Sequence, residues 1–308
     1  MMKFKNPILV WKSLGRLGRI EARDFYIWIS PWLIGFIIWR AWPMVYSLYL
    51  SFTDFRLLNR PTFTGLENIH TLMADDTYWK SVEVTLGYVI GVVPIGTIIA
   101  LIAAMTLSQK LRGVNFWRAI YFLPSVVSGV AVAVMWSFIL NPDFGLLNSI
   151  LAVFGIEGPG WHTSETWALP SIILIGWWAG IGSQMIIYIA GIKGIPSVLY
   201  ESAEIDGAGP FAKFWNITVP MLSPTILFNV VTQLIAAFQA FDHAWALTEG
   251  GPNNATRVYI VGLYENAFIF TKMGYASLMA WVLFIIILIL TGVMLRISAK
   301  RVHYEVEV

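Results

Sequence analysis

Two clusters of polar residues could carry chemistry in this chain, and neither has the composition of a catalytic centre. Glu201, Glu204 and Asp206 place three carboxylates in one short stretch. Asn229 and Gln233 are four residues apart, which puts two amides on one face of a helix. No nucleophile–base set or cofactor motif accompanies them, and the four histidines have no metal-binding spacing. The chain contains no cysteine, which excludes thiolate chemistry and Cys-based metal sites. We therefore expect a protein that is not an enzyme and that binds no metal or cofactor of its own.

The elements that position these residues are expected to lie in a membrane. Of the 308 residues, 57% are hydrophobic and 12% are charged, whereas soluble domains carry about 25% charged residues. The 15 tryptophans fit the same environment, because Trp favours the interface between lipid and water. The net charge of +2 is near neutral, and no basic block indicates nucleic-acid binding. The composition therefore predicts an all-α integral membrane protein.

Six stretches are long and apolar enough to cross the membrane, since about 20 such residues span the roughly 30 Å of hydrocarbon. Each is expected to be one helix, because β-barrel strands would show alternating segments of about 10 residues. The six predicted spans are residues 25–50, 84–107, 116–140, 167–192, 222–244 and 277–295.

The distribution of Lys and Arg predicts the orientation of these spans, because both residues favour the cytoplasmic side. Several basic residues precede the first span, and most of the others fall in segments on that same side. The loop 141–166, on the other side, has no Lys or Arg. We therefore expect both termini in the cytoplasm, with 1–24 as a cytoplasmic segment, 25–297 as the six-span domain and 298–308 as a cytoplasmic tail.

The carboxylate cluster belongs to a cytoplasmic loop, 194–224, that the sequence predicts to be ordered. Pro196 suits the first turn of a helix over 198–206, and Gly207 can end that helix because glycine takes the left-handed conformation at low cost. Pro210 can begin a second short helix. Such a loop exposes carboxylates and apolar groups together, which suits docking into a groove of a soluble partner. The alternative is a solvated acidic face.

The loop "YESAEIDGAGPFAKFWNITVPMLSP" closely resembles the EAA motif of binding-protein-dependent ABC importer permeases. The motif positions are Glu201, Ala203, Gly207, Ile217 and Pro220, and Ser202 and Val219 are small departures from the family pattern. The resemblance extends over nearly the whole chain, including "SFTDF", "FTGLEN", "YFLPSVVSGVAVAVMWSFILNPDFGLLN" and "EGGPNNAT", and it is closest to the larger partner of maltose-type carbohydrate permeases.

This resemblance implies a type I ABC importer permease fold with a cytoplasmic coupling helix, in a bacterial or archaeal cytoplasmic membrane. It implies a heterodimer with a second permease, two ATPase subunits, an external solute-binding protein and a sugar substrate. ATP and Mg would be bound by the ATPase, since the sequence has no Gly-Lys dipeptide and so no P-loop. The residues implied to couple to the ATPase are Glu201, Ala203, Glu204, Asp206, Gly207, Ile217 and Pro220. The alternative is an ion-coupled secondary transporter, but no acid lies near the centre of any predicted span.

The substrate pathway is expected where polar side chains interrupt the spans. The candidates are Asn229 and Gln233, whose face Ala236 and Ala240 extend, then Trp177, Gln184 and Tyr188 on one face of the fourth span, and then Ser125 and Ser128. Hydrogen bonds between helices are the alternative role for all of them. Arg40, within the first span, could attract an anionic sugar, but pairing with backbone carbonyls near Pro43 is the favoured interpretation.

Overall fold

The computed structural model describes residues 15–109 and 112–298, and these residues form helices and loops. An antiparallel bridge between Thr53 and Phe63 is the only β pairing among them. The helices before the first long loop and just after it are α2 (Arg16–Phe36), the π-helical turn η1 (Ile37–Ala41), α3 (Trp42–Leu50) and α4 (Glu67–Met73).

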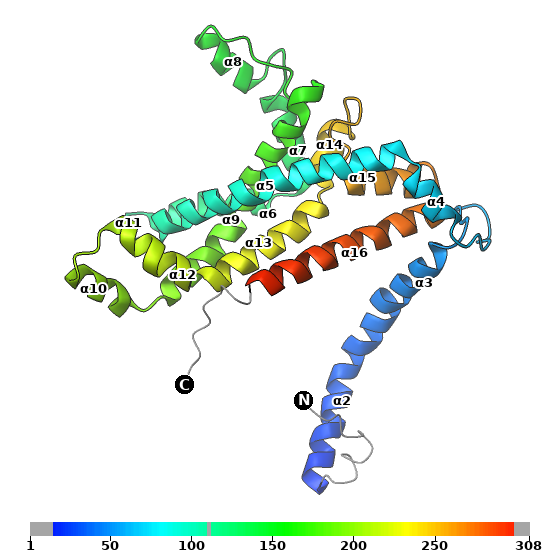
Figure 1. Cartoon of the computed structure of the whole chain (residues 1–308), viewed down its shortest axis with the longest axis horizontal. Helices are drawn as coiled ribbons and strands as arrows, with labels where there is room; N and C mark the ends of the chain where they lie inside the picture. Colours follow the sequence, from blue (N-terminus) through cyan, green and yellow to red (C-terminus); the bar gives the residue numbers. More distant parts are fainter. Residues whose placement is uncertain (1–14, 110–111, 299–308) are drawn as a thin grey trace.

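Four long helices make the body of the molecule: α5 (Asp76–Ser108), α9 (Glu165–Gly194), α13 (Ser223–Phe238) and α16 (Met273–Ser298). α5 and α9 share the most extensive packing, in which the small side chains of Ala100 and Ala104 and the large side chain of Ile175 are fully buried. α5, α9 and α16 run in one direction and α13 in the other (Figure 1). This alternation is what successive membrane spans require.

The predicted third span, 116–140, is wrong as a single helix. The chain forms α6 (Val114–Val126) and α7 (Gly129–Ile139), which are bent by 102° at the break between them. Pro124 precedes the break, and the side chain of Ser128 caps the second helix by accepting from the N–H of Ala131 at 3.4 Å. Five helices are therefore long and apolar enough to cross a membrane in the part of the chain that the structure describes, or six if the bent pair is one span.

The predicted fifth span, 222–244, corresponds to one candidate span, Ser223–Thr248, which contains a short non-helical link. α13 ends at Phe238, and α14 (Asp242–Thr248) begins after a short non-helical link. The break in the fifth span meets the break in the third, because Asp242 packs against Gly129, where even a Cβ atom would clash with the carboxylate. The link within the fifth span therefore touches the break in the third.

The first span stands apart from the body. α2 has no buried residue and leaves the bundle at an angle, while α3 packs along α16 (Figure 1). The Trp281 indole N–H donates to the Ser47 hydroxyl at 3.1 Å and holds α3 in place. Arg40 lies in η1, where it and the three residues before it are exposed.

After α7, an arm leads to α8 (Leu146–Val153), which projects away from the long helices (Figure 1). Asn148 braces this arm. Its amide donates to the carbonyl of Pro142 at 2.9 Å, and its side-chain oxygen accepts from the Trp161 indole N–H at 2.6 Å. The arm is therefore held in one conformation by its own hydrogen bonds.

The loop before the last helices is fixed by a buried ion pair. Arg257 binds Glu265 at 2.6 Å and also donates to the Thr77 carbonyl at 3.1 Å, so it ties the loop to α5. The helices here are α15 (Tyr259–Tyr264) and the π-helical turn η3 (Glu265–Ile269). Burial raises the pKa of Tyr259 well above its ordinary value, so its hydroxyl keeps the proton that it donates to the Met279 carbonyl at 2.8 Å.

Candidate functional site

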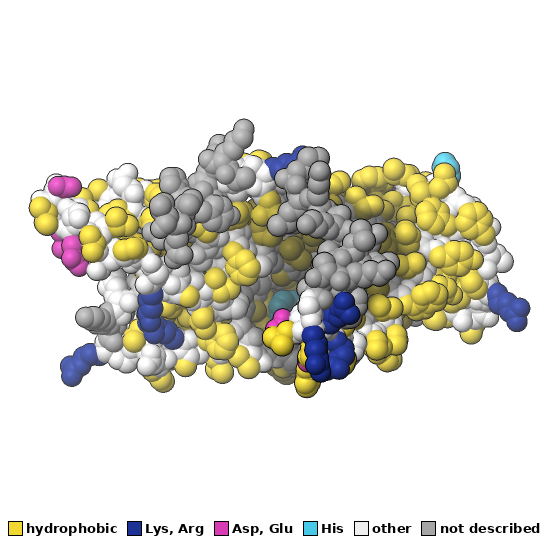
Figure 2. Space-filling model, turned by 90° about the horizontal axis from the view of Figure 1, so that it is seen from below, with side chains coloured by type: hydrophobic (Ala, Val, Ile, Leu, Met, Phe, Trp, Pro, Cys, Tyr) yellow, Lys and Arg dark blue, Asp and Glu magenta, His cyan; other side chains and the backbone are white. Residues whose placement is uncertain are grey.

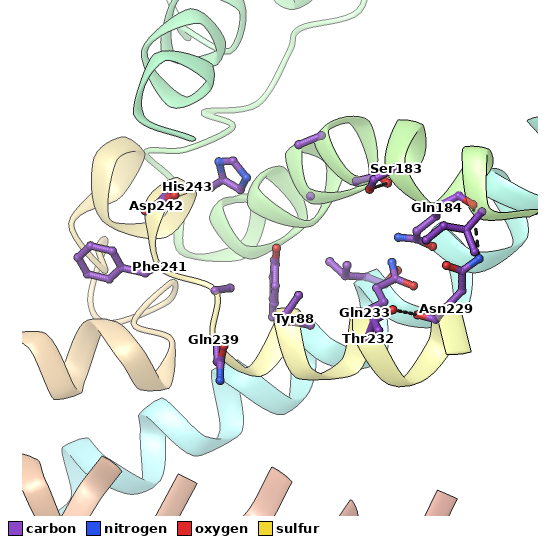
Figure 3. Close-up of a pocket in the computed structure, with 18 residues that line it drawn as sticks. Tyr88, Ser183, Gln184, Asn229, Thr232, Gln233, Gln239, Phe241, Asp242 and His243 are labelled. Atoms are coloured by element: carbon purple, nitrogen blue, oxygen red, sulfur yellow. Dashed lines mark hydrogen bonds between the residues drawn. The ribbon is translucent and has the colours of Figure 1, made fainter. Parts of the chain in front are cut away.

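A cavity of about 500 Å³ lies between α5, α9, α13 and α14. Polar side chains gather at both of its ends (Figure 3). Gln184, Asn229 and Gln233 lie at one end, and Asp242 and His243 lie at the other. Small residues keep the space between them open, and they include Gly176, Ala179, Gly180, Ala236 and Ala240. The cavity opens to the outside of the chain, because Ser183, Thr232 and Ala236 are exposed.

Asn229 and Gln184 are lining residues whose side-chain oxygens have no hydrogen-bond partner, and the Nδ1 atom of His243, also in the lining, has none either in the described residues. The Asn229 side chain is 0% exposed, and its amide donates to the backbone carbonyl of Gln184 at 3.4 Å. The side-chain oxygens of both residues have no hydrogen-bond partner among the described residues. An unsatisfied buried acceptor costs about 1–3 kcal/mol. A hydroxyl-bearing solute or water in the cavity would supply the missing donors.

Gln233 has a different environment, although it lines the same cavity. Its amide donates to the Val92 carbonyl at 3.3 Å, and its oxygen accepts from the Thr97 hydroxyl at 3.0 Å. Both bonds join α13 to α5. Gly96 leaves room for this side chain, since a Cβ there would clash with the Gln233 amide. The geometry of Gln233 therefore fits helix–helix hydrogen bonding.

The other predicted pathway residues lie outside the lining of this cavity. The Trp177 indole donates to the Gly91 carbonyl at 3.1 Å and joins α9 to α5. Tyr188 is fully buried, and its hydroxyl faces the side chains of Asn229 and Thr97. Ser125 donates to the Phe122 carbonyl at 2.7 Å within α6, and Ser128 caps α7. Of the seven predicted pathway residues, the structure brings Asn229, Gln233 and Gln184 together in the cavity.

Several lining residues were missed by the sequence analysis: Tyr88, Ser183, Thr232, Gln239, Phe241, Asp242 and His243. A signal existed for two of them. Thr232 and Gln239 flank the small-residue face that begins at Asn229. Phe241, Asp242 and His243 depend on the break between α13 and α14, which turns the end of the span into the cavity wall, whereas Tyr88 and Ser183 reach the cavity from α5 and α9.

The second site is the loop that follows α9, and its first helix ends as the sequence predicts. α10 (Ser197–Ile205) stops where Gly207 takes a φ of 77°. The N–H of Gly207 donates to the Glu204 carbonyl at 3.0 Å, and the N–H of Ala208 donates to the Ala203 carbonyl at 2.8 Å. This pair of bonds is a Schellman motif, which satisfies the last carbonyls of the helix. α10 is therefore an ordered helix with a defined end.

A second set of short helices folds back on α10. They are α11 (Pro210–Lys213), the π-helical turn η2 (Phe214–Thr218) and α12 (Val219–Met221). Lys213 binds Glu204 at 2.6 Å, and the hydroxyls of Tyr200 and Thr218 lie 2.9 Å apart. Ala203, Ile217 and Pro220, by contrast, are half-buried, so they support the loop.

The loop presents a mixed acidic and apolar surface at one end of the molecule. Glu201 and Asp206 are exposed, and so are Ile205 at 87% and Phe211 at 77%. Figure 2 shows acidic and hydrophobic side chains together at the end that carries α10, while hydrophobic side chains are widespread over the rest of that face, with groups of Lys and Arg side chains among them.

Comparisons with known proteins identify the family. Residues 96–304 match the family described as binding-protein-dependent transport system inner membrane component. The chain is 41% identical over 285 residues to the probable ABC transporter permease protein YesP of Bacillus subtilis (strain 168), covering 91% of this chain and 92% of that protein. It is 32% identical over 265 residues to the multiple sugar-binding transport system permease protein MsmF of Streptococcus mutans, covering 86% and 91%. The chain belongs to the family of binding-protein-dependent transport system inner membrane components.

A solved structure has the same fold. It is a chain in the crystal structure of a bacterial alginate ABC transporter in complex with an alginate pentasaccharide-bound periplasmic protein. The TM-score is 0.82 with 23% sequence identity, and the match covers 93% of this chain and 98% of that one. The predicted ABC importer permease fold is thus confirmed, and family membership confirms that the chain is a multi-pass membrane permease and not an enzyme.

Proposed function

We propose that this chain is the membrane-spanning subunit of an ATP-binding-cassette importer that carries a sugar. The observation that supports the proposal most is the match to ABC permeases over nine tenths of the chain, including a structured loop at the position of the EAA motif. The polar cavity and the loop then have complementary roles. The cavity is part of the substrate pathway, and the loop transmits the conformational change of a separate ATPase subunit to the permease.

The lining of the cavity favours a neutral, hydroxyl-rich solute. Asn229 and Gln184 offer unpartnered acceptors, Tyr88 and Phe241 offer ring faces, and no Lys or Arg lies among the described lining residues. The multiple sugar-binding system of Streptococcus mutans and the lactose transport system of Rhizobium radiobacter carry permeases similar to this chain. Arg40 lies in the first span, away from the cavity lining, so it gives no support to an anionic substrate.

The loop 194–224 is proposed to dock on the ATPase subunit. Glu201, Asp206 and Ile205 form its exposed tip, while Gly207 and the Glu204–Lys213 pair hold its shape. ATP and Mg would be bound by that ATPase. Closure of the ATPases around ATP would move α10 and shift the permease between inward- and outward-open states, which is a two-state equilibrium biased from outside the chain.

The complex is proposed to contain a second, unlike permease, two ATPase subunits and an external solute-binding protein. The permease would lie in a bacterial or archaeal cytoplasmic membrane with both termini in the cytoplasm, which puts the loop on the ATPase side. Because the chain contains no cysteine, a single Ala208→Cys substitution gives one thiol for a membrane-impermeant label. Labelling only from the cytoplasmic side is expected, and labelling from the outside would contradict the orientation.

The function itself is tested by transport in proteoliposomes that contain the whole complex. Uptake of a labelled neutral sugar should require ATP inside and the binding protein outside. Ionophores should leave it unchanged. Uptake that persists without nucleotide and stops with an ionophore would instead establish an ion-coupled transporter.

A further inference from the structure

Among the described residues that line the cavity, Asp242 is the one Asp or Glu. Its side chain is exposed, and its carboxylate takes part in no ion pair or hydrogen bond within residues 15–109 and 112–298. A carboxylate carries a negative charge at neutral pH. Because no Lys or Arg lines the cavity in the described chain either, no such cation offsets this charge.

The carboxylate of Asp242 is held in a built position between α14 and the start of α7. Gly129, the first residue of α7, lies against it, and a Cβ atom at Gly129 would collide with the carboxylate. α7 has 11 residues, and the N-terminus of a helix carries a partial positive charge that favours a nearby anion. That partial charge amounts to about half an elementary charge, so the site as a whole stays negative.

The cavity is small enough for this charge to act on any solute inside it. A sphere of about 500 Å³ is about 10 Å across, which is close to the Debye length of about 8 Å at physiological ionic strength. Dissolved salt therefore screens the charge only in part over that distance. Small apolar residues form much of the wall, and a cleft with low-dielectric walls focuses the field of a charge that it contains.

The direction of α13 indicates which end of the cavity Asp242 occupies. α13 begins at Ser223, within the loop 194–224, and ends at Phe238, shortly before Asp242. In the proposed orientation that loop faces the cytoplasm, so the end of the cavity at Asp242 faces the outside, opposite the end at Asn229 (Figure 3). An imported solute would therefore pass Asp242 before it reached Asn229.

We propose that Asp242 selects solutes by charge. It keeps anionic sugars, such as uronates and sugar phosphates, out of the cavity, and it admits neutral and cationic sugars, amino sugars included. The inference rests on the proposed function for the class of solute and narrows that class by its charge. Like charges repel strongly in a confined site of low dielectric. A hydroxyl or an ammonium group can instead donate to the free carboxylate, and the bond from the ammonium group is strengthened by its charge.

A single thiol in the cavity can report the potential there, because the chain contains no cysteine. Ser183→Cys replaces an exposed lining residue with one of similar size. The whole complex in detergent is treated with two methanethiosulfonate reagents, one bearing a quaternary ammonium group and the other a sulfonate, which stands for an anionic solute. The reactions are run at about pH 8, where histidine side chains such as that of His243 are ordinarily uncharged. The mass of this chain gives both rates.

The ratio of the cationic to the anionic rate is the measurement, since both reagents attack the same thiolate and its abundance cancels. A potential of one thermal unit changes this ratio about seven-fold, because the two reagents respond in opposite directions. Asp242→Asn should lower the ratio by about five-fold or more, and Asp242→Glu, which keeps the charge, should retain it. Asp143→Asn removes an exposed carboxylate outside the cavity lining and should leave the ratio unchanged.

An unchanged ratio in Asp242→Asn would overturn the inference. So would a failure of both reagents to react at Ser183→Cys and at Ala236→Cys, a second exposed lining position, because no solute would then reach the charge. The labelling requires neither ATP nor the binding protein, so this inference can fail while ATP-driven uptake stands. Uptake without nucleotide, together with the expected ratio, would instead overturn the proposed function and leave the charge selection intact.

Discussion

The turn between α10 and α11 allows a sharp test of the coupling loop, because its two glycines, Gly207 after α10 and Gly209 before α11, are both exposed but differ in backbone conformation. Gly207 has a φ of 77°, whereas Gly209 has a φ of −71°. A Cβ atom at either position would meet nothing within 4 Å. Alanine at Gly207 therefore adds only the cost of the left-handed conformation, about 1–2 kcal/mol, and alanine at Gly209 adds almost none.

The cost at Gly207 should appear in binding of the ATPase subunit. A penalty of 1–2 kcal/mol corresponds to a factor of about 5–30 in an equilibrium constant. Gly207→Ala should weaken the affinity of the permease complex for its ATPase by that factor, measured by titration in nanodiscs. Gly209→Ala should leave the affinity unchanged, and Gly207→Asn should fall between, because Asn adopts the left-handed conformation more readily.

Thermal unfolding of the permease should be the same for these variants, since Gly207 and Gly209 are exposed and pack on none of the long helices. Equal affinities of the Gly207→Ala and Gly209→Ala variants for the ATPase subunit would refute the reasoning, whether both affinities are unchanged or both are reduced.

Two further predictions concern the body of the chain. Arg257→Gln should lower the unfolding free energy by about 2–4 kcal/mol, because it removes a buried guanidinium and leaves the half-buried Glu265 without its partner, and thermal unfolding in detergent measures this loss. Arg56→Gln, in an exposed pair with Asp54, should change it by less than about 1 kcal/mol, and equal effects of the two would contradict the argument. Gly180→Leu should abolish sugar uptake while the complex still assembles, since its side chain would enter the cavity, where a Cβ meets only the Gln184 amide at 3.5 Å. Gly182→Ala should instead prevent assembly, measured by co-purification, because its Cβ would collide with the Tyr121 carbonyl.

The coupling loop was predictable because its signals are local. Gly207 and Pro210 act on the residues beside them, so the end of α10 and the start of α11 appear where the sequence placed them. The spans were predictable for a similar reason, since hydropathy sums over a window. Their roles in docking and transport stay predictions.

The breaks could not be predicted in this way. Pro124 precedes the break between α6 and α7, but Pro94 lies inside α5 and Pro170 inside α9, and both of those helices continue. A proline in a span therefore does not decide whether the span breaks. The outcome depends on what packs around the freed backbone groups, here Asp242 from the far side of the sequence.

The roles of the polar residues in the cavity also depend on the neighbouring helices, which supply or withhold their hydrogen-bond partners. Gln233 and Asn229 look equivalent in the sequence, yet only Gln233 has both ends of its amide bound, to α5. Spacing showed that the two share a helix face. It could not show which of them has a free acceptor, because that depends on the neighbouring helix.

The apolar tip of the coupling loop has a consequence for the biosynthesis of the complex. Ile205 and Phe211 stand almost fully in water in the lone chain, and covering each one stabilises the assembled state by about 1.5–3 kcal/mol. A cell that makes this subunit faster than its ATPase subunit would accumulate unassembled copies whose apolar loop side chains stay exposed and can aggregate. Balanced synthesis of the components, or rapid proteolysis of unassembled copies, follows from these two side chains.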